Sequence, residues 1–502
     1  MNLPNRHLLP VLALLLAFVL GLLSVFSFAP FNAFWLVFFT WGGLFWLLET
    51  PALPSRDAAL RGGFFGLGLF LGGCSWVYVS LHTYGGMPFL LAALLTLLFC
   101  AVLALYPALL ALLHVTLRKR FALPPIAAAL LFATLWGLMD WLRSWIFTGF
   151  PWLSLGYTQT HDSPLSGYLP LLGVFGVSLL TAWVAALLCS LRQSWFLFLF
   201  ILLGGWALSK ITWTTPEGPA LQVALIQGNV AQNLKWQPEH TVNTLNAYKK
   251  QIETALDQPE RPRLIVLPET AFPLLLHDLP TDYRNALLHD LRTHEADLLF
   301  GTVTQETSPS GKQHYRNSAV SLGVSPSQQY HKSHLVPFGE FIPTGFRWFL
   351  DWVKIPMVNL APGSPEAPPL ELQGQHLGIN ICYEDVFGES LRIPLPAAKI
   401  LINLSNTAWF GDSLAQPQHL QMAQARAQEL GRPVLRATNT GMTAVIDPDG
   451  VVRAQLPAFT QGTLYASVQG FSGQTPYARW GNTALLILSA SFLLNLFWRK
   501  RP

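Results

Sequence analysis

The feature that most constrains the fold is a series of apolar runs that are long enough to cross a membrane. A hydrocarbon layer about 30 Å thick is spanned by about 20 helical residues. Seven such runs precede residue 213, and an eighth closes the chain: Leu8–Phe28, Phe31–Leu48, Gly62–Ser80, Pro88–Leu117, Phe121–Trp141, Pro164–Leu191, Ser194–Leu208 and Gly481–Trp498. The sequence therefore predicts a polytopic α-helical membrane domain of eight transmembrane helices. The first run is longer than a usual signal-peptide core and no small-x-small cleavage site follows it, so we expect it to remain as a helix.

The segment between the seventh and eighth runs has a different composition. Residues 1–213 contain thirteen Lys, Arg, Asp and Glu, whereas residues 214–480 contain forty-two. Charged residues make up 12% of the whole chain, against about 25% in typical soluble domains, so an entirely soluble protein is excluded. The predicted domains are residues 1–213 with helices one to seven, a polar domain at 219–470, the eighth helix at 481–498 and a tail at 499–502.

The distribution of cations predicts the orientation, because Lys and Arg in short loops stay on the cytoplasmic side. With a cytoplasmic N-terminus, the inside segments hold ten cations and the outside loops hold two. The inside ones are Arg6, Arg56, Arg61, Arg118, Lys119, Arg120, Arg192, Arg499, Lys500 and Arg501, and the outside ones are Arg143 and Lys210. We therefore expect both termini in the cytoplasm and the polar domain in the periplasm, at the inner membrane of a Gram-negative cell. The net charge of +4 lies mostly in these loops, where anionic lipid explains it, and nucleic acid binding is not indicated.

The polar domain contains short β-rich segments separated by amphipathic stretches. This pattern favours an α/β sandwich with largely buried sheets. Strands are expected at residues 221–227, 264–267, 298–304, 318–322, 377–381, 400–404, 434–437 and 443–446. Helices are expected at 239–256, 282–294 and 416–430. The sequence Asp447-Pro448-Asp449-Gly450 predicts a hairpin turn.

Three polar residues stand at strand ends, where a rigid frame can hold reactive groups. They are Glu269, Lys332 and Cys382. Each has an ordinary explanation when taken alone: an exposed turn carboxylate, a solvated lysine and a small buried thiol. Cys382 is the single cysteine of the polar domain, so a disulfide within that domain is excluded. Its apolar strand ends at the thiol and three polar residues follow, which places the thiol at a strand end.

Histidine-based alternatives fit the sequence less well. His331 and His334 flank Lys332, but no Cys or further His lies nearby to complete a ligand set, so no metal site is predicted. His376 precedes Cys382 by six residues, which is about 20 Å along a straight strand. We therefore do not expect a histidine to activate the thiol.

The order Glu, Lys, Cys and the flanking sequences resemble the nitrilase superfamily, whose αββα domain uses these three residue types as a catalytic triad. The match extends from Leu221 to about Gly470 and includes the Pro-Glu-Thr, His-Lys and Cys-Tyr-Glu segments. Together with the membrane helices, the chain resembles the membrane-embedded branch that adds the third acyl chain to bacterial lipoproteins. The resemblance implies Glu269 as general base, Lys332 as the group that stabilises the oxyanion and the intermediate, and Cys382 as nucleophile.

The resemblance also implies supporting or substrate-binding residues. Glu340 corresponds to a second carboxylate that orients the lysine and supports the tetrahedral intermediate. Tyr383, Glu384 and Trp236 match residues needed for activity, and Asn317 is a further match. Each of the first three also has a structural alternative. Trp236 could pack in the core, Tyr383 could cap the sheet, and Glu384 could be an ordinary carboxylate at a helix N-terminus.

The reaction implied by the resemblance has two covalent steps. A membrane phospholipid, with phosphatidylethanolamine preferred, donates its sn-1 acyl group to the cysteine as a thioester. The α-amine of an S-diacylglyceryl-cysteine apolipoprotein then takes the acyl chain, giving the mature triacylated lipoprotein. A lipid bilayer, no cofactor and a monomeric enzyme are expected.

Two other functions remain open on the sequence alone. A membrane-tethered nitrilase-type amidase or hydrolase would use the same three residues with water as the second nucleophile. A transporter or receptor would show broken or charged helices or inverted repeats, and the pairs Gly62-Gly63 and Gly72-Gly73 keep that possibility open.

Two segments of the sequence suggest contact with lipid. The aromatic-rich stretch Phe341–Leu360 predicts an amphipathic arm in the outer leaflet that gates acyl-chain entry. Asp140 and Arg143, three residues apart near the outer end of the fifth run, are expected to pair on one helix face and to snorkel toward the interface.

Overall fold

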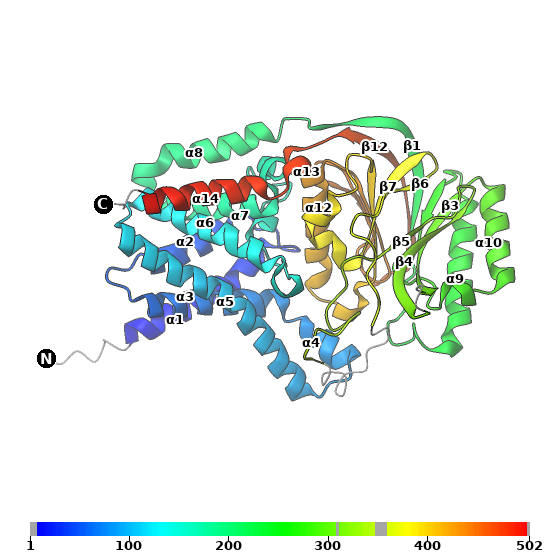
Figure 1. Cartoon of the computed structure of the whole chain (residues 1–502), viewed down its shortest axis with the longest axis horizontal. Helices are drawn as coiled ribbons and strands as arrows, with labels where there is room; N and C mark the ends of the chain where they lie inside the picture. Colours follow the sequence, from blue (N-terminus) through cyan, green and yellow to red (C-terminus); the bar gives the residue numbers. More distant parts are fainter. Residues whose placement is uncertain (1–7, 308–310, 347–358, 499–502) are drawn as a thin grey trace. The chain divides into compact units, whose positions relative to one another are not determined.

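The computed structural model describes residues 8–307, 311–346 and 359–498, and the chain divides into two compact units (Figure 1). The helical unit comprises Met1–Tyr78, Phe89–Thr212 and Arg479–Pro502. The sandwich unit comprises Trp213–Ala478 together with a short piece from the first half of the chain, Val79–Pro88.

Each of the eight predicted apolar runs overlaps a helix. These helices are α1 (Leu8–Leu23), α2 (Leu36–Leu48), α3 (Ser55–Cys74), α5 (Phe89–Phe121), α6 (Pro125–Arg143), α7 (Leu169–Leu187), α8 (Leu191–Leu208) and α14 (Thr483–Trp498). Within the described residues, four stretches are long and apolar enough to cross a membrane: Pro10–Ser27, Phe89–Phe121, Pro125–Arg143 and Ser166–Leu208. A fifth arises if Ser55–Cys74 and Val77–Tyr84, which are bent by 56°, are counted as one span. Length and composition thus make a membrane-embedded N-terminal region plausible.

The stretch Ser166–Leu208 folds back on itself. The Tyr168 hydroxyl, at the start of α7, donates a hydrogen bond to the Ile201 carbonyl of α8 at 3.0 Å. A Cβ placed on Gly205 would lie 2.2 Å from the Pro164 carbonyl oxygen, so the end of α8 touches the segment before α7. α7 and α8 are therefore antiparallel neighbours, which agrees with the two separate runs predicted there.

The glycines of α3 allow close helix packing. A Cβ on Gly62 would lie 2.3 Å from the Pro107 carbonyl oxygen of α5, and one on Gly68 would lie 2.1 Å from the Phe18 carbonyl oxygen of α1. Small residues permit this approach of backbones, which drives helix association where no hydrophobic effect operates between helices. Gly62 thus has a packing role in the helical unit.

The expectation that Asp140 and Arg143 snorkel toward the interface is wrong. Both residues are buried, with 5% and 3% of their surface exposed, and their side chains pair at 2.9 Å. Arg143 also donates to the carbonyl oxygens of Phe150 and Trp152, at 2.6 and 2.5 Å, and Asp140 accepts from the Leu155 N–H at 2.9 Å. The pair instead fixes the loop after α6 through hydrogen bonds to its backbone groups.

The sandwich unit contains two six-stranded sheets. The first has the order β12-β1-β2-β3-β4-β5 and the second the order β11-β10-β9-β8-β7-β6. The strands are β1 (Thr214–Gln227), β2 (Leu264–Val266), β3 (Asp297–Thr307), β4 (Gln313–Gly323), β5 (Gln329–His331), β6 (Leu370–Leu372), β7 (Gln375–Ile381), β8 (Ile400–Ser405), β9 (Val434–Thr438), β10 (Ala444–Ile446), β11 (Val452–Gln455) and β12 (Gly462–Gly473). Each sheet has a parallel centre: β1, β2 and β3 in the first, and β7, β8 and β9 in the second.

The two sheets pack face to face and helices cover their outer faces. Alternate residues of β1 show this arrangement: Leu221, Val223 and Leu225 join the core between the sheets, whereas Ala224 and Ile226 join the core against the helices. The helices on the first sheet are α9 (Pro238–Leu256) and α10 (Thr281–Thr293), and α12 (Ala415–Leu430) covers the second (Figure 1). The predicted αββα sandwich is confirmed, as are its three predicted helices.

The eight strands predicted from the sequence are the eight interior strands of the two sheets. The four that the sequence pattern missed, β5, β6, β11 and β12, are the four sheet edges. Edge strands have one unpaired side and partial burial: only two of the twelve residues of β12, and none of β11, are buried. They therefore lack the continuous apolar run that marks an interior strand.

The turn predicted at residues 447–450 is also confirmed. It joins β10 and β11, which pair antiparallel. The Gly450 N–H donates to the Asp447 carbonyl oxygen at 2.8 Å, and the Asp447 N–H donates to the Val451 carbonyl oxygen at 2.9 Å.

Candidate active site

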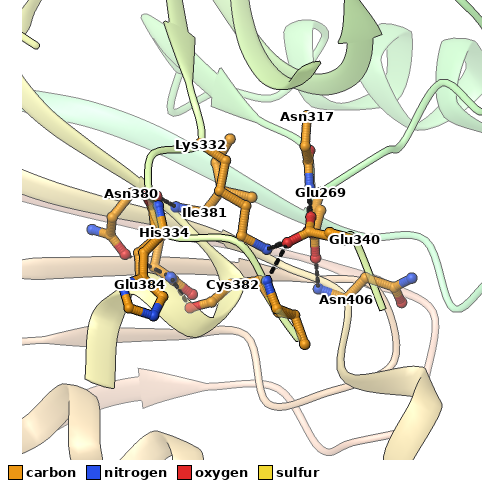
Figure 2. A network of polar contacts seen from close by, with 12 residues as sticks. Glu269, Asn317, Lys332, His334, Glu340, Asn380, Ile381, Cys382, Glu384 and Asn406 are labelled. Atoms are coloured by element: carbon orange, nitrogen blue, oxygen red, sulfur yellow. Dashed lines mark hydrogen bonds and ion pairs between the residues drawn. The ribbon is translucent and has the colours of Figure 1, made fainter. Parts of the chain in front are cut away.

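The ends of three strands bring Glu269, Lys332 and Cys382 into one cluster (Figure 2). Glu269 follows β2 of the first sheet by three residues, Lys332 directly follows β5 of the same sheet, and Cys382 directly follows β7 of the second sheet. The carboxyl ends of the parallel strands are the usual position of sites in such sheets. Residues that are far apart in the sequence thus converge on a rigid frame.

The Glu269 carboxylate is buried and held at both oxygens. Oε1 accepts a hydrogen bond from Asn317 Nδ2 at 2.7 Å, and Oε2 accepts one from the Asn406 backbone N–H at 2.9 Å. Lys332 Nζ lies 3.4 Å from Oε1. With 7% of the residue exposed, this carboxylate is fixed in orientation and largely shielded from water.

The backbone at Glu269 requires a glycine on the neighbouring strand. A Cβ placed on Gly301 of β3 would lie 2.4 Å from the Thr270 nitrogen and 2.7 Å from the Glu269 Cα. Thr270 itself has a φ of 46°, in the left-handed region. Close approach of β3 therefore fixes the turn that presents the Glu269 side chain.

Replacing Gly301 with Ala is expected to push this turn away and to destabilise the protein by about 1–3 kcal/mol, the usual cost of overpacking. Thermal unfolding of the purified protein measures the change. Gly462→Ala is the matched control, because the nearest atom to a Cβ there is a Leu456 methyl carbon at 3.4 Å. Equal unfolding temperatures for the two variants would contradict the close approach.

Lys332 lies between two carboxylates. Its ammonium is 2.9 Å from Glu340 Oε2 and 3.4 Å from Glu269 Oε1, and 1% of the residue is exposed. Asn317 Nδ2 also donates to Glu340 Oε1, at 2.8 Å, so one amide bridges both carboxylates. Burial alone would lower the pKa of Lys332, but Glu340 and Glu269 together raise it above its ordinary value. Lys332 is therefore a permanent positive charge.

Cys382 has an unusual backbone conformation. Its φ is 55°, in the left-handed region that non-glycine residues rarely adopt. It is the first residue of the 3-10 turn Cys382–Val386, directly after β7. Asn403 of β8 donates from Nδ2 to the Cys382 carbonyl oxygen at 3.1 Å, which holds the strained turn. Strain of this kind is common where a side chain must be presented at a site.

The thiol of Cys382 is protonated at neutral pH. Burial raises its pKa to about 12, and the negative charge of Glu269 adds to this rise. Lys332, the Ser405 hydroxyl and the Asn406 N–H act in the opposite direction. A thiolate thus forms only if a nearby base takes the proton, and Glu269 is a carboxylate whose charge acts directly on this thiol.

Glu384 connects the two segments that carry Lys332 and Cys382. Its carboxylate accepts hydrogen bonds from the Ser333 N–H and hydroxyl at 2.7 Å each, and from the His334 N–H at 3.0 Å. It also accepts from the Ile381 N–H at 2.7 Å and from the Tyr330 hydroxyl at 2.9 Å. Glu384 therefore fixes the segment after β5 against the end of β7.

The remaining predicted residues lie nearby with less direct contacts. Tyr383 is buried, and its ring centroid lies 6.0 Å from that of His334 and 5.1 Å from that of Phe387. Trp236 is half-buried and directly follows a buried lysine, Lys235. His376 is exposed and sits at the opposite end of β7 from Cys382. Of the predicted arm, residues 347–358 lie outside the described part of the chain.

Two polar neighbours of Glu269 were missed from the sequence. Asn406 follows β8 in the same way as Cys382 follows β7, so the change from apolar to polar residues at this strand end was a usable signal. Lys235 donates from Nζ to the Glu269 carbonyl oxygen at 3.0 Å. It lies in the loop between β1 and α9, where no periodic pattern marks it.

The cluster has the parts needed for covalent acyl transfer. It combines a protonated thiol, a carboxylate held at both oxygens and a buried ammonium. A carboxylate base can take the thiol proton, and a fixed positive charge can stabilise the oxyanion that forms when a thiolate attacks a carbonyl carbon.

Two family models match the chain in succession. Residues 20–187 match the apolipoprotein N-acyltransferase N-terminal domain, and residues 222–477 match the carbon-nitrogen hydrolase domain. The second match contains every residue of the cluster described above.

Curated relatives match over almost the whole chain. An apolipoprotein N-acyltransferase of Nitrosomonas europaea is 45% identical over 96% of this chain and 96% of its own length. One of Ralstonia nicotianae is 44% identical over 97% of this chain and 93% of its own length. One of Chromobacterium violaceum is 41% identical over 99% and 96%, respectively.

Proposed function

Because this chain belongs to the apolipoprotein N-acyltransferase family and N-acylates lipoproteins, we propose that it transfers the acyl chain through a thioester on Cys382. Glu269 is the general base, and Lys332 stabilises the oxyanion. The observation that carries this proposal is the convergence of Cys382 with a carboxylate fixed at both oxygens and a buried ammonium. Burial raises the pKa of the Cys382 thiol to about 12. Such a thiol needs a base in the same site.

In the first half-reaction, Glu269 takes the Cys382 proton as the sulfur attacks the sn-1 ester carbonyl of a phospholipid, preferably phosphatidylethanolamine. Lys332 and the N–H of Tyr383 stabilise the resulting oxyanion. The ester C–O bond then breaks, and Glu269 returns the proton to the leaving oxygen. The products are the Cys382 thioester and a lysophospholipid.

In the second half-reaction, the α-amine of the S-diacylglyceryl cysteine attacks the thioester carbonyl. Glu269 takes a proton from this amine, the C–S bond breaks, and the proton passes to the Cys382 sulfur. The enzyme returns to its initial state, and the lipoprotein carries a third acyl chain in amide linkage. Glu340 keeps Lys332 in place through both steps, at 2.9 Å.

We infer the membrane topology of the protein from the distribution of positive charges in its loops. The protein is a monomer whose eight helices cross the inner membrane. Both termini are cytoplasmic, and residues 219–470 form the periplasmic catalytic domain. The ten-to-two distribution of cations supports this topology. The antiparallel α7 and α8 supply the odd number of spans that it requires before β1.

A labelled phospholipid tests the proposed donor and distinguishes transfer from hydrolysis. Vesicles containing the protein, phosphatidylethanolamine with an isotope in its sn-1 chain, and a diacylglyceryl-cysteine peptide should yield the label in amide linkage on the peptide. Cys382→Ala should abolish this product, whereas Cys189→Ala, at an exposed cysteine of the helical unit, should retain it. Release of labelled fatty acid at the same rate without the peptide would favour the hydrolase alternative.

A further inference from the structure

A second buried ammonium contacts the backbone of Glu269. Lys235 is 2% exposed, and its Nζ donates to the Glu269 carbonyl oxygen at 3.0 Å. The titratable groups whose charges act on it, among the described residues, are Glu269 and Cys382. These are the proposed base and the proposed nucleophile.

The loop that carries Lys235 is fixed to the other sheet. Gln232 Oε1 accepts from Asn406 Nδ2 at 2.8 Å. The Val230 N–H donates to Asn439 Oδ1 at 2.9 Å, and the Val230 carbonyl oxygen accepts from Asn439 Nδ2 at 2.8 Å. Asn406 and Asn439 directly follow β8 and β9. Lys235 is therefore held in place by side chains at the carboxyl ends of these strands.

Lys235 adds a second positive charge beside the carboxylates of the cluster. Glu269 and Glu340 are two buried carboxylates, 7% and 6% exposed, and Lys332 alone supplies one positive charge against them. Without Lys235, the two carboxylates face a single ammonium, and the negative charge near Cys382 is larger. That charge would oppose the formation of a thiolate on Cys382, because Coulomb interactions are strong at low dielectric.

We propose that Lys235 is a positioning residue of the acyl transfer: its ammonium holds the Glu269 backbone and supplies the second positive charge against which Cys382 loses its proton. This inference rests on the proposed function, because it needs Cys382 to be the nucleophile. It predicts that acylation of Cys382 depends on the protonation of Lys235.

The pH dependence follows from the burial of Lys235. Burial lowers the pKa of Lys235 to about 8, while Glu269 and Cys382 act in the opposite direction. Lys235 is thus charged below pH 8 and loses its charge as the pH rises through 8. The rate of Cys382 acylation should therefore fall on the alkaline side. Lys332 cannot cause this fall, because its pKa is raised.

The test is a single-turnover acylation of Cys382 by phosphatidylglycerol vesicles without an acceptor, followed by intact-protein mass spectrometry. The headgroup of this lipid does not titrate across the range, so it cannot produce the pH profile. The wild-type rate should fall about tenfold from roughly pH 7 to 9, as a group with a pKa near 8 requires. Lys235→Arg should remove this fall, since arginine stays charged. Lys235→Met should be slower than wild type by about tenfold or more at neutral pH, with no fall near pH 8.

The matched control is Gln237→Ala, which removes an exposed hydrogen bond to Asn233 in the same loop and should keep the wild-type profile. The inference is overturned if the wild-type rate does not fall, if Lys235→Arg keeps the fall, or if Lys235→Met has the wild-type rate. If Lys235→Met does not fold, the wild-type and arginine profiles decide. A wild-type protein that forms no Cys382 adduct would contradict the proposed function instead.

Discussion

Replacing Glu269 with Gln is expected to lower the rate of lipoprotein acylation by about a thousandfold, within the range assigned to a lost general base. The thiol of Cys382 has a pKa of about 12, so the thiolate fraction at neutral pH is very small. Glutamine keeps the shape of the side chain but cannot take the proton. Single-turnover acylation of a diacylglyceryl peptide measures the loss.

The Glu269→Gln variant should remain folded, because the glutamine oxygen can still accept from Asn317 or Asn406. Its unfolding temperature should therefore stay close to that of the wild type, which separates a chemical defect from a structural one. Glu371→Gln, an exposed change on β6, is the control. A Glu269→Gln variant that is folded and retains activity within about tenfold of the wild type would exclude Glu269 as the base.

Replacing Lys332 with Met is expected to damage both stability and activity. The change leaves Glu269 and Glu340 as two buried carboxylates without the cation between them, which costs about 3–5 kcal/mol for a buried pair that loses one partner. It also removes the positive charge that we propose stabilises the oxyanion, with an expected loss of at least about a hundredfold in rate. Thermal unfolding and single-turnover acylation measure the two effects separately.

A double variant separates these effects. Lys332→Met with Glu340→Gln removes one of the facing negative charges, so part of the lost stability should return while activity stays low. Lys399→Met is the control for loss of a more exposed ion pair, with Glu217 at 2.8 Å, and should cost about 1 kcal/mol or less. Recovery of activity in the double variant would contradict the role of Lys332 at the oxyanion.

The sequence predicted the interior of the sandwich and missed its edges for one physical reason. Interior strands such as β8, with all six residues buried, are largely apolar on both faces, and this produces a visible run. The edge strands β11 and β12 are partly exposed, and only two residues of β12 and none of β11 are buried. Their positions are fixed by pairing with β10 and β1, which are tertiary contacts that a local pattern does not contain.

The candidate active site also combines residues that a local sequence pattern predicts with residues whose roles depend on distant contacts. Glu269 and Cys382 were visible because a polar residue follows an apolar strand. Asn317 was proposed only through the resemblance, since its role depends on two carboxylates that are 48 and 23 residues away. Lys235 was missed because its partner is a backbone oxygen 34 residues away. In each case the missing information was a contact between distant segments.

The buried pair Asp140 and Arg143 shows why the prediction that these side chains extend toward the interface was wrong. From the sequence, an outer helix end suggested contact with the interface. The carbonyl groups of Phe150 and Trp152 make burial of Arg143 possible. A loop that returns to the helix end supplied partners that helix spacing alone does not reveal.

The most direct test of acyl transfer through Cys382 is the mass of the intact protein after incubation with phosphatidylethanolamine in the absence of a diacylglyceryl-cysteine acceptor. Acyl transfer through Cys382 should increase this mass by one sn-1 acyl chain, located on Cys382 by peptide mapping and removed when a diacylglyceryl-cysteine peptide is added. Formation of triacylated peptide without this adduct, or an adduct on another residue that the peptide discharges, would contradict it.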